Sequence, residues 1–451
     1  MNYSSPQTER LNGMFAACLL AFVLNIITLP CQASAADKQT RARLNSSYEK
    51  RSPGLEAFEL NQARALDAAK KGSSLAQFSP PARSAGSVEP VRLTWPERNR
   101  PLVIGIPTSR SVRQGRVLGV TPAQDLVTFS LLPDLQQQVE GIVQRTRAPH
   151  VAVVAMDPRT GRVLALADKS SGLRDAAFHA GFPAASLFKV VTAAAAVERA
   201  RVAPDARIAF RGGNYTLNQW NYLPNTRTDR RVMSLTEALG RSCNPVFGRV
   251  ALRFLTPDAL ESFAERFGFN EKIYFDAPLP ESAASIPSDK YGLSRTAAGF
   301  GAVTISPIHA ATLMAGLANG GKMSRPILID KITNRNGQPI YSSHTEVIAQ
   351  MVRPDTARKV LEMMKSTTTI GTSRKDFAAS RGRPALPVNV AAKTGTLSGK
   401  NPKGLNHWFI ATAPLENPKV AIAVIVVDPQ NSSARAARVG REVLEYYLFR
   451  R

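Results

Sequence analysis

The chain has 451 residues, of which 44% are hydrophobic and 20% are charged. This excludes a mini-protein and wholesale disorder, and the length is expected to hold two or three domains with at least one large core. The formal net charge of +24 at pH 7 indicates an anionic neighbour, either nucleic acid, an acidic lipid surface or an anionic polymer.

Residues 1–35 are predicted to be an export segment. No charged residue lies between Gly13 and Pro30, a length that suits a signal-peptide core or a short membrane span. The first interpretation is a signal peptide cleaved after Ala35, and the alternative is an uncleaved membrane anchor. Either way the bulk of the chain reaches the periplasm or the cell-envelope face of the cytoplasmic membrane. We therefore expect no nucleic-acid partner, and expect the positive charge to face an anionic membrane or wall surface.

Residues 36–125 are predicted to form a flexible tether that contains one helix. Leu55, Phe58 and Leu66 have helical spacing, whereas the second half of the segment is rich in Pro, Ser and Arg and lacks periodicity. The arginine-rich stretch Arg110–Arg116 is expected to be solvated or to face a membrane. The folded domain is expected to occupy residues 126–451.

The elements of this domain alternate between strand and helix signals. Strand-like residues 126–132 lead into an amphipathic helix after Pro133, and residues 151–156 and 163–167 form a hairpin around a turn. An alanine-rich helix follows from Ala185 to Ala200.

Near the far end the strand pattern returns at residues 390–397, 407–413 and 420–427, and a helix follows over residues 434–448. Strands at both ends of the domain that enclose a mostly helical middle predict an α+β fold. Its discontinuous antiparallel sheet of about five strands would be flanked by helices and carry an inserted, mostly helical lobe. A cleft is expected between the lobes.

Cysteine and histidine usage argues against a metal or a disulfide. Only Cys243 would remain in a processed chain, and the five histidines are scattered without a ligand pattern. We expect no metal site and no cofactor.

The first motif that can carry chemistry is Ser186-Leu187-Phe188-Lys189, at the start of a predicted helix. Residues three apart share a helix face, so the lysine lies one turn from the serine. A serine hydroxyl becomes a nucleophile when a base removes its proton, and lysine can act as that base when burial or another cation lowers its pKa.

Two further motifs follow in the chain, Ser242-Cys243-Asn244 and Lys393-Thr394-Gly395-Thr396. The former supplies a hydroxyl and an amide, and the latter supplies a second cation, two hydroxyls and a glycine that lets a ligand approach the backbone. An S-x-x-K pattern alone is uninformative, because about one or two matches arise by chance in a chain this long, and another stands at Ser47–Lys50. The ordered set of three motifs predicts an acyl-transfer site.

These motifs resemble the S-x-x-K, S-x-N and K-T-G set of the penicillin-binding proteins and serine β-lactamases. The likeness to the transpeptidase domain of monofunctional, class B-like penicillin-binding proteins extends over roughly residues 126–447. It includes residues 155–165, 182–186 and 301–310, and the pair Trp408-Phe409.

The resemblance implies catalytic roles for three residues. Ser186 would attack the carbonyl between two D-alanines of a peptidoglycan stem peptide and form an acyl-enzyme, while Lys189 takes its proton. Ser242 would relay a proton to the departing D-alanine.

The remaining motif residues would hold the substrate. Asn244 would hold the peptide chain, and Lys393 with Thr394 and Thr396 would bind the terminal carboxylate beside Gly395. The backbone N–H groups of Ser186 and Thr396 would form the oxyanion hole.

The resemblance also implies partners. These are stem peptides ending in D-Ala-D-Ala, β-lactams as covalent inhibitors, and a separate glycosyltransferase. The alternatives left open are a D,D-carboxypeptidase, a serine β-lactamase, or a sensor that binds β-lactams or muropeptides without turnover.

Overall fold

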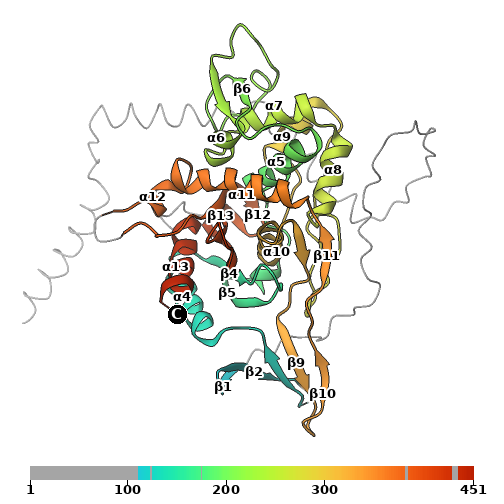
Figure 1. Cartoon of the computed structure of the whole chain (residues 1–451), viewed down its shortest axis with the longest axis vertical. Coiled ribbons are helices and arrows are strands. Elements are labelled where there is room, and N and C mark those ends of the chain that lie inside the picture. The colour runs from blue at the N-terminus through green and yellow to red at the C-terminus, as the bar shows by residue number, and fades with distance from the viewer. Residues whose placement is uncertain (1–109, 122–123, 174, 381–383, 429–434, 451) are drawn as a thin grey trace, which may run out of the picture. The chain divides into compact units, whose positions relative to one another are not determined.

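A computed structural model describes residues 110–121, 124–173, 175–380, 384–428 and 435–450 (Figure 1). The signal peptide or anchor predicted in residues 1–35, and the tether up to residue 109, lie outside these ranges. Among the helices that the structure describes, none combines the length and the apolar character needed to cross a membrane.

The central sheet is antiparallel, with the strand order β12-β13-β14-β4-β5. Its strands are β4 (His150–Met156), β5 (Val163–Ser170), β12 (Ala391–Lys400), β13 (Lys403–Ala413) and β14 (Val420–Asp428). The first two come from the beginning of the domain and the last three from its end. This confirms the predicted discontinuous five-stranded sheet.

Helices cover both faces of this sheet, and the strands β14 and β4 are buried along their whole length. Alternate residues of β14 enter two different cores: Ile422 and Val424 lie in one, and Ala423 and Ile425 lie in the other. The first core is closed by α4 (Pro133–Arg145) and α13 (Ala436–Phe449), which pack against each other. The second is closed chiefly by α10 (Pro307–Ala318).

The lobe inserted between β5 and β12 is mostly helical, as predicted. Polar side chains cap several of its helices; Ser234, for example, forms a capping box with Glu237. The helices are α5 (Phe188–Arg199), α6 (Leu235–Gly240), α7 (Asn244–Phe254), α8 (Pro257–Arg266), α9 (Lys290–Ala297), α10, α11 (Pro354–Thr369) and α12 (Arg374–Phe377). Two short sheets accompany them, β6 (Arg207–Phe210) with β7 (Arg231–Ser234), and β8 (Lys322–Ser324) with β11 (Val347–Gln350).

A second five-stranded sheet was not expected from the sequence. Its strands, in the order β1-β2-β3-β9-β10, are β1 (Arg110–Arg113), β2 (Arg116–Val120), β3 (Leu126–Phe129), β9 (Ile329–Thr333) and β10 (Pro339–Ser342). The domain boundary predicted at residue 126 is therefore too late, because ordered strands already begin at Arg110. The arginine-rich stretch is a hairpin whose turn residues, Gln114 and Gly115, both have positive φ.

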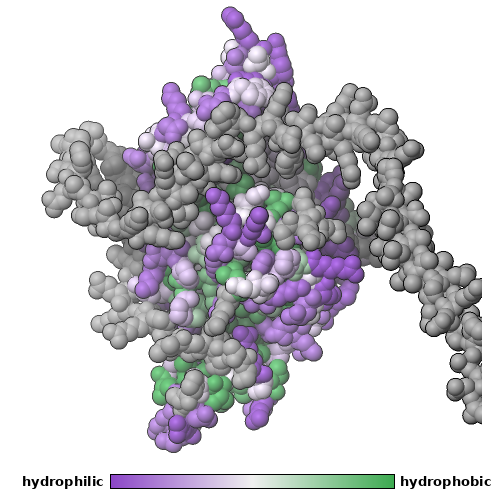
Figure 2. Space-filling model, turned by 180° about the vertical axis from the view of Figure 1, so that it is seen from behind, coloured by the Kyte–Doolittle hydropathy of each residue, from purple (hydrophilic) through white to green (hydrophobic). Residues whose placement is uncertain are grey.

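This second sheet lies at the lower end of the molecule in Figure 1, and Figure 2 shows apolar side chains at its surface. Val112, Val120, Leu126 and Ile340 are among the exposed large hydrophobic residues. Short strands with exposed side chains give little periodicity, and β3 pairs with a strand some 200 residues further along the chain, Phe129 opposite Ile329. The sequence pattern therefore could not reveal the sheet.

Candidate active site

The three predicted motifs converge on one cavity of about 700 Å³. Its wall includes Ser186, Ser242, Asn244 and the strand residues 394–396. Lys189 and Lys393 lie behind this wall and are both fully buried. The structure thus brings together all eight residues that the motifs single out.

Ser186 is held at the start of a helix by close backbone packing. It lies in η2 (Ala185–Leu187), directly before α5, and the preceding Ala185 has a φ of +50°. Gly299 leaves room for this turn, because a Cβ there would lie 2.1 Å from the Ala185 carbonyl oxygen. On the other side, Gly395 allows β12 to approach Ala185. Two glycines therefore let the nucleophile sit between the lobe and the sheet.

Lys189 contacts the nucleophile directly. Its Nζ lies 2.8 Å from Ser186 Oγ, 2.7 Å from Asn244 Oδ1 and 2.5 Å from the Ala298 carbonyl oxygen. Burial lowers the pKa of this amine to about 7. Near neutral pH a large share of Lys189 is therefore uncharged and can accept the Ser186 proton.

Lys393 is turned toward Ser242. Its Nζ donates to Ser242 Oγ at 3.0 Å and to the Thr394 carbonyl oxygen at 2.7 Å. Burial, together with the nearby Lys189, holds the pKa of Lys393 well below its ordinary value. Lys393 is thus placed to orient the Ser242 hydroxyl, and the carboxylate contact that the resemblance implies stays a prediction.

Asn244 is the first residue of α7, and a neighbouring loop fixes its orientation. Its backbone N–H donates to the Asn214 carbonyl oxygen at 2.6 Å, and its Nδ2 donates to the Tyr215 carbonyl oxygen at 2.7 Å. The amide nitrogen is thus occupied, so the amide oxygen faces Lys189. The loop therefore orients the Asn244 side chain so that its Oδ1 contacts the Lys189 amine.

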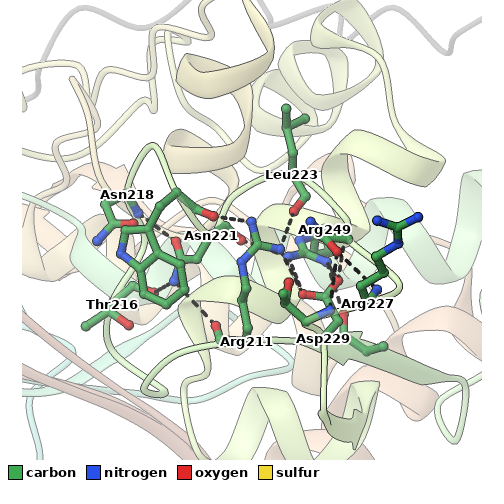
Figure 3. Close-up of polar contacts among 12 residues, drawn as sticks. Arg211, Thr216, Asn218, Asn221, Leu223, Arg227, Asp229 and Arg249 are labelled. Atoms are coloured by element: carbon green, nitrogen blue, oxygen red, sulfur yellow. Dashed lines mark hydrogen bonds and ion pairs between the residues drawn. The ribbon is translucent and has the colours of Figure 1, made fainter.

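This loop, residues 211–230 between β6 and β7, is pinned to α7 by a buried carboxylate (Figure 3). Asp229 accepts two hydrogen bonds from Arg249, at 2.6 and 3.1 Å, and one from Arg211 at 3.0 Å. Burial alone would raise its pKa, but the bonds from Arg249, the Asn225 N–H and Arg211 outweigh it and hold the pKa of Asp229 at about 2. Because Arg249 belongs to the helix that Asn244 begins, Asp229 ties the loop to the S-x-N motif.

Sequence reasoning missed part of the cavity wall. Tyr215, Thr372, Asp376 and Arg435 all line it, and the Thr372 and Thr394 hydroxyls contact each other. None belongs to a recognisable short motif, and they reach the cavity from a loop and from the ends of helices. Among the described residues, no group of three or more His, Cys, Asp and Glu side chains is placed to hold a metal ion.

Comparisons with known proteins agree with this geometry. A family model described as the penicillin binding protein transpeptidase domain matches residues 151–445. The peptidoglycan D,D-transpeptidase PbpA of Mycobacterium tuberculosis is 30% identical over 342 residues, which cover 66% of this chain and 67% of PbpA.

Solved structures show the same likeness. The D,D-transpeptidase domain of a peptidoglycan glycosyltransferase from Eggerthella lenta matches with a TM-score of 0.60 and 26% identity, covering 75% of this chain and 88% of that one. The penicillin G acyl-enzyme of penicillin-binding protein A from Mycobacterium tuberculosis matches with a TM-score of 0.56 and 28% identity, covering 71% and 80%.

Proposed function

Because the chain belongs to the penicillin-binding protein transpeptidase family, we propose that it is a peptidoglycan D,D-transpeptidase that cross-links stem peptides through a Ser186 acyl-enzyme. The observation that carries the proposal is the buried Lys189 amine, 2.8 Å from Ser186 Oγ. An ordinary surface lysine would be protonated and could not act as the base. β-Lactams acylate the same serine.

Acylation uses the groups already in contact. Lys189 Nζ takes the hydroxyl proton while Ser186 Oγ attacks the carbonyl carbon of the terminal D-Ala-D-Ala bond. The C–N bond breaks, and a proton reaches the leaving nitrogen through the Ser242 hydroxyl, which Lys393 orients. The backbone N–H groups of Ser186 and Thr396 stabilise the oxyanion, a device that contributes about 3 kcal/mol per donor.

Transfer completes the cycle. The amine of a second stem peptide attacks the ester carbonyl, the bond to Ser186 Oγ breaks, and the proton lost by the amine returns to Ser186 Oγ. During acylation Asn244 holds the donor peptide chain, while Thr394 and Thr396 bind its terminal carboxylate beside Gly395.

Release of D-alanine from a pentapeptide tests the proposal. We expect release by the wild type and by Ser47→Ala, which removes the serine of the other S-x-x-K match, and none by Ser186→Ala. Equal release by wild type and Ser186→Ala would show that another residue is the nucleophile. Binding of a β-lactam without any release would favour the sensor alternative.

The activity is proposed to act at the cell-envelope face of the cytoplasmic membrane. The apolar run in residues 13–30 supports export by a cleaved signal peptide or an anchor. The glycan strands that it cross-links would come from a separate glycosyltransferase, and the net charge of +24 would favour an anionic membrane or wall surface.

A further inference from the structure

The motifs leave part of the cavity wall unassigned. This part consists of Thr372, Asp376 and Arg435, together with Ala436 and Ala437 at the start of α13. The Thr372 and Thr394 hydroxyls contact each other, so this part of the wall adjoins the K-T-G strand. Under the proposed function, Thr394 meets the carboxylate of the departing D-alanine.

The charges in the cavity wall are unevenly placed. Lys189 and Lys393 lie behind the wall, and Lys393 makes its hydrogen bonds to Ser242 and to a backbone carbonyl. Among the described residues that line the cavity, Arg435 is the only lysine or arginine. This guanidinium is therefore a cationic group that a carboxylate in the cavity can reach.

Arg435 remains accessible although an acid stands beside it. Its Nη1 lies 3.8 Å from Asp376 Oδ1, and the exposed fraction of the side chain is 59% for Arg435 but 11% for Asp376. A long, partly exposed pair of this kind is weak. Asp376 can thus anchor one end of the guanidinium, while the other donors stay available to a ligand carboxylate.

We propose that Arg435 binds the carboxylate of the departing D-alanine and, by the same contact, selects acceptor amines that carry a carboxylate on the amine-bearing carbon. This inference rests on the proposed function. In the second half-reaction the acceptor nitrogen attacks the ester carbonyl, the carbonyl–Oγ bond breaks, and the proton lost by the amine ends on Ser186 Oγ. The incoming amine occupies the place that the leaving amine vacated, so a group that held the leaving carboxylate also meets the acceptor's carboxylate.

The test is the partition of the acyl-enzyme between two amines. Wild-type enzyme is acylated by a D-Ala-D-Ala pentapeptide in the presence of D-alanine or D-alaninamide, both isotopically labelled, and the transfer products are counted by mass spectrometry. The product formed with D-alanine is itself a D-Ala-D-Ala donor, so the ratio is taken from initial rates. It then depends only on steps after acylation, and a change in donor binding does not affect it.

We expect Arg435→Gln to lower the preference for D-alanine over D-alaninamide about fivefold, the size of one partly exposed ionic contact. Arg435→Lys, which keeps the charge, should retain part of the preference. Arg438→Gln is the matched control. Arg438 lies in α13, which Arg435 directly precedes, and its side chain is 68% exposed against 59% for Arg435. It pairs with Glu442 and does not line the cavity. This control should leave the ratio unchanged.

The outcomes separate the two proposals. If the wild type releases D-alanine but Arg435→Gln keeps the wild-type ratio, or if the wild type transfers to neither amine, the role of Arg435 is overturned and the D,D-peptidase reaction stands. If the wild type releases no D-alanine from the donor, the proposed function fails and this inference fails with it.

Discussion

Lys189 can serve as a base because its amine is fully buried. Lys189 has an exposed fraction of 0%, and its partners are a hydroxyl, an amide oxygen and a backbone carbonyl. None of these is an anion that would stabilise the ammonium form. Burial therefore shifts the balance toward the neutral amine, which is the form the chemistry requires.

The pH dependence of acylation follows from this environment. Because the pKa of Lys189 is lowered to about 7, the rate of acylation by a fluorescent penicillin should level off above pH 7. Below pH 7 it should fall about tenfold per unit as the amine gains a proton. Circular dichroism at each pH would show that the enzyme stays folded. A rate that is flat from about pH 5 to 9 would contradict lysine as the base.

The motifs identified the residues that touch the nucleophile, but not all of their tasks. Spacing alone placed Ser186 and Lys189 one helical turn apart, and the structure agrees. The amine of Lys393 also donates a hydrogen bond to Ser242 Oγ, a contact that the motifs did not predict. The direction of a buried side chain depends on packing between strand and lobe, which the short motif does not encode.

At the scale of elements, the loop over residues 211–230 supports the S-x-N motif. It has no regular secondary structure apart from turns, yet the Asn214 and Tyr215 carbonyl groups orient the Asn244 amide. Asp229 holds the loop to α7 through Arg249, whose side chain is 4% exposed. This support could not be predicted from the sequence, because Asp229 and Arg249 are 20 residues apart and neither belongs to a motif.

Removal of the Asp229 charge should therefore loosen the site. Asp229→Asn leaves Arg249 without its carboxylate, and we expect a loss of about 2 kcal/mol in the free energy of unfolding, measured with urea. Acylation by penicillin should also slow, because Asn244 would no longer be held toward Lys189.

Asp355→Asn is the control for this prediction. Asp355 also pairs with two basic side chains, Arg358 and Lys359, but on the exposed surface of α11. We expect the urea unfolding midpoint and the acylation rate of Asp355→Asn to match those of the wild type. A wild-type acylation rate in folded Asp229→Asn would show that the loop does not position Asn244.

At the scale of the molecule, the catalytic sheet was predictable and the second sheet was not. Buried β-branched runs such as residues 151–156 and 420–427 gave clear strand signals, and their positions at both ends of the domain fixed the discontinuous topology. The hairpin at residues 110–120 has mostly exposed side chains. Its pairing with β3 and, through it, β9 depends on contacts between distant segments.

This hairpin also carries basic residues that could contact the expected anionic membrane surface. Arg113 and Arg116 are exposed beside its turn, near exposed apolar residues such as Val112. We expect the protein to bind vesicles that contain an anionic phospholipid more tightly than neutral vesicles, with binding weakened by salt. Reversal of both arginines to glutamate should reduce binding more than the same reversal of Arg227 and Arg230, which are exposed in the loop of residues 211–230.

Equal losses in the two double variants would mean that net charge alone governs vesicle binding. Equal binding to anionic and neutral vesicles would remove the lipid surface as a partner.

The most direct test of the account is the site of penicillin attachment. After incubation with penicillin G, intact-mass measurement of the wild type should show one adduct of the full inhibitor mass, because ring opening adds the molecule without loss. Peptide mapping should place this adduct on Ser186, and Ser186→Ala should carry none. An adduct on another residue, or the same adduct on Ser186→Ala, would contradict the mechanism.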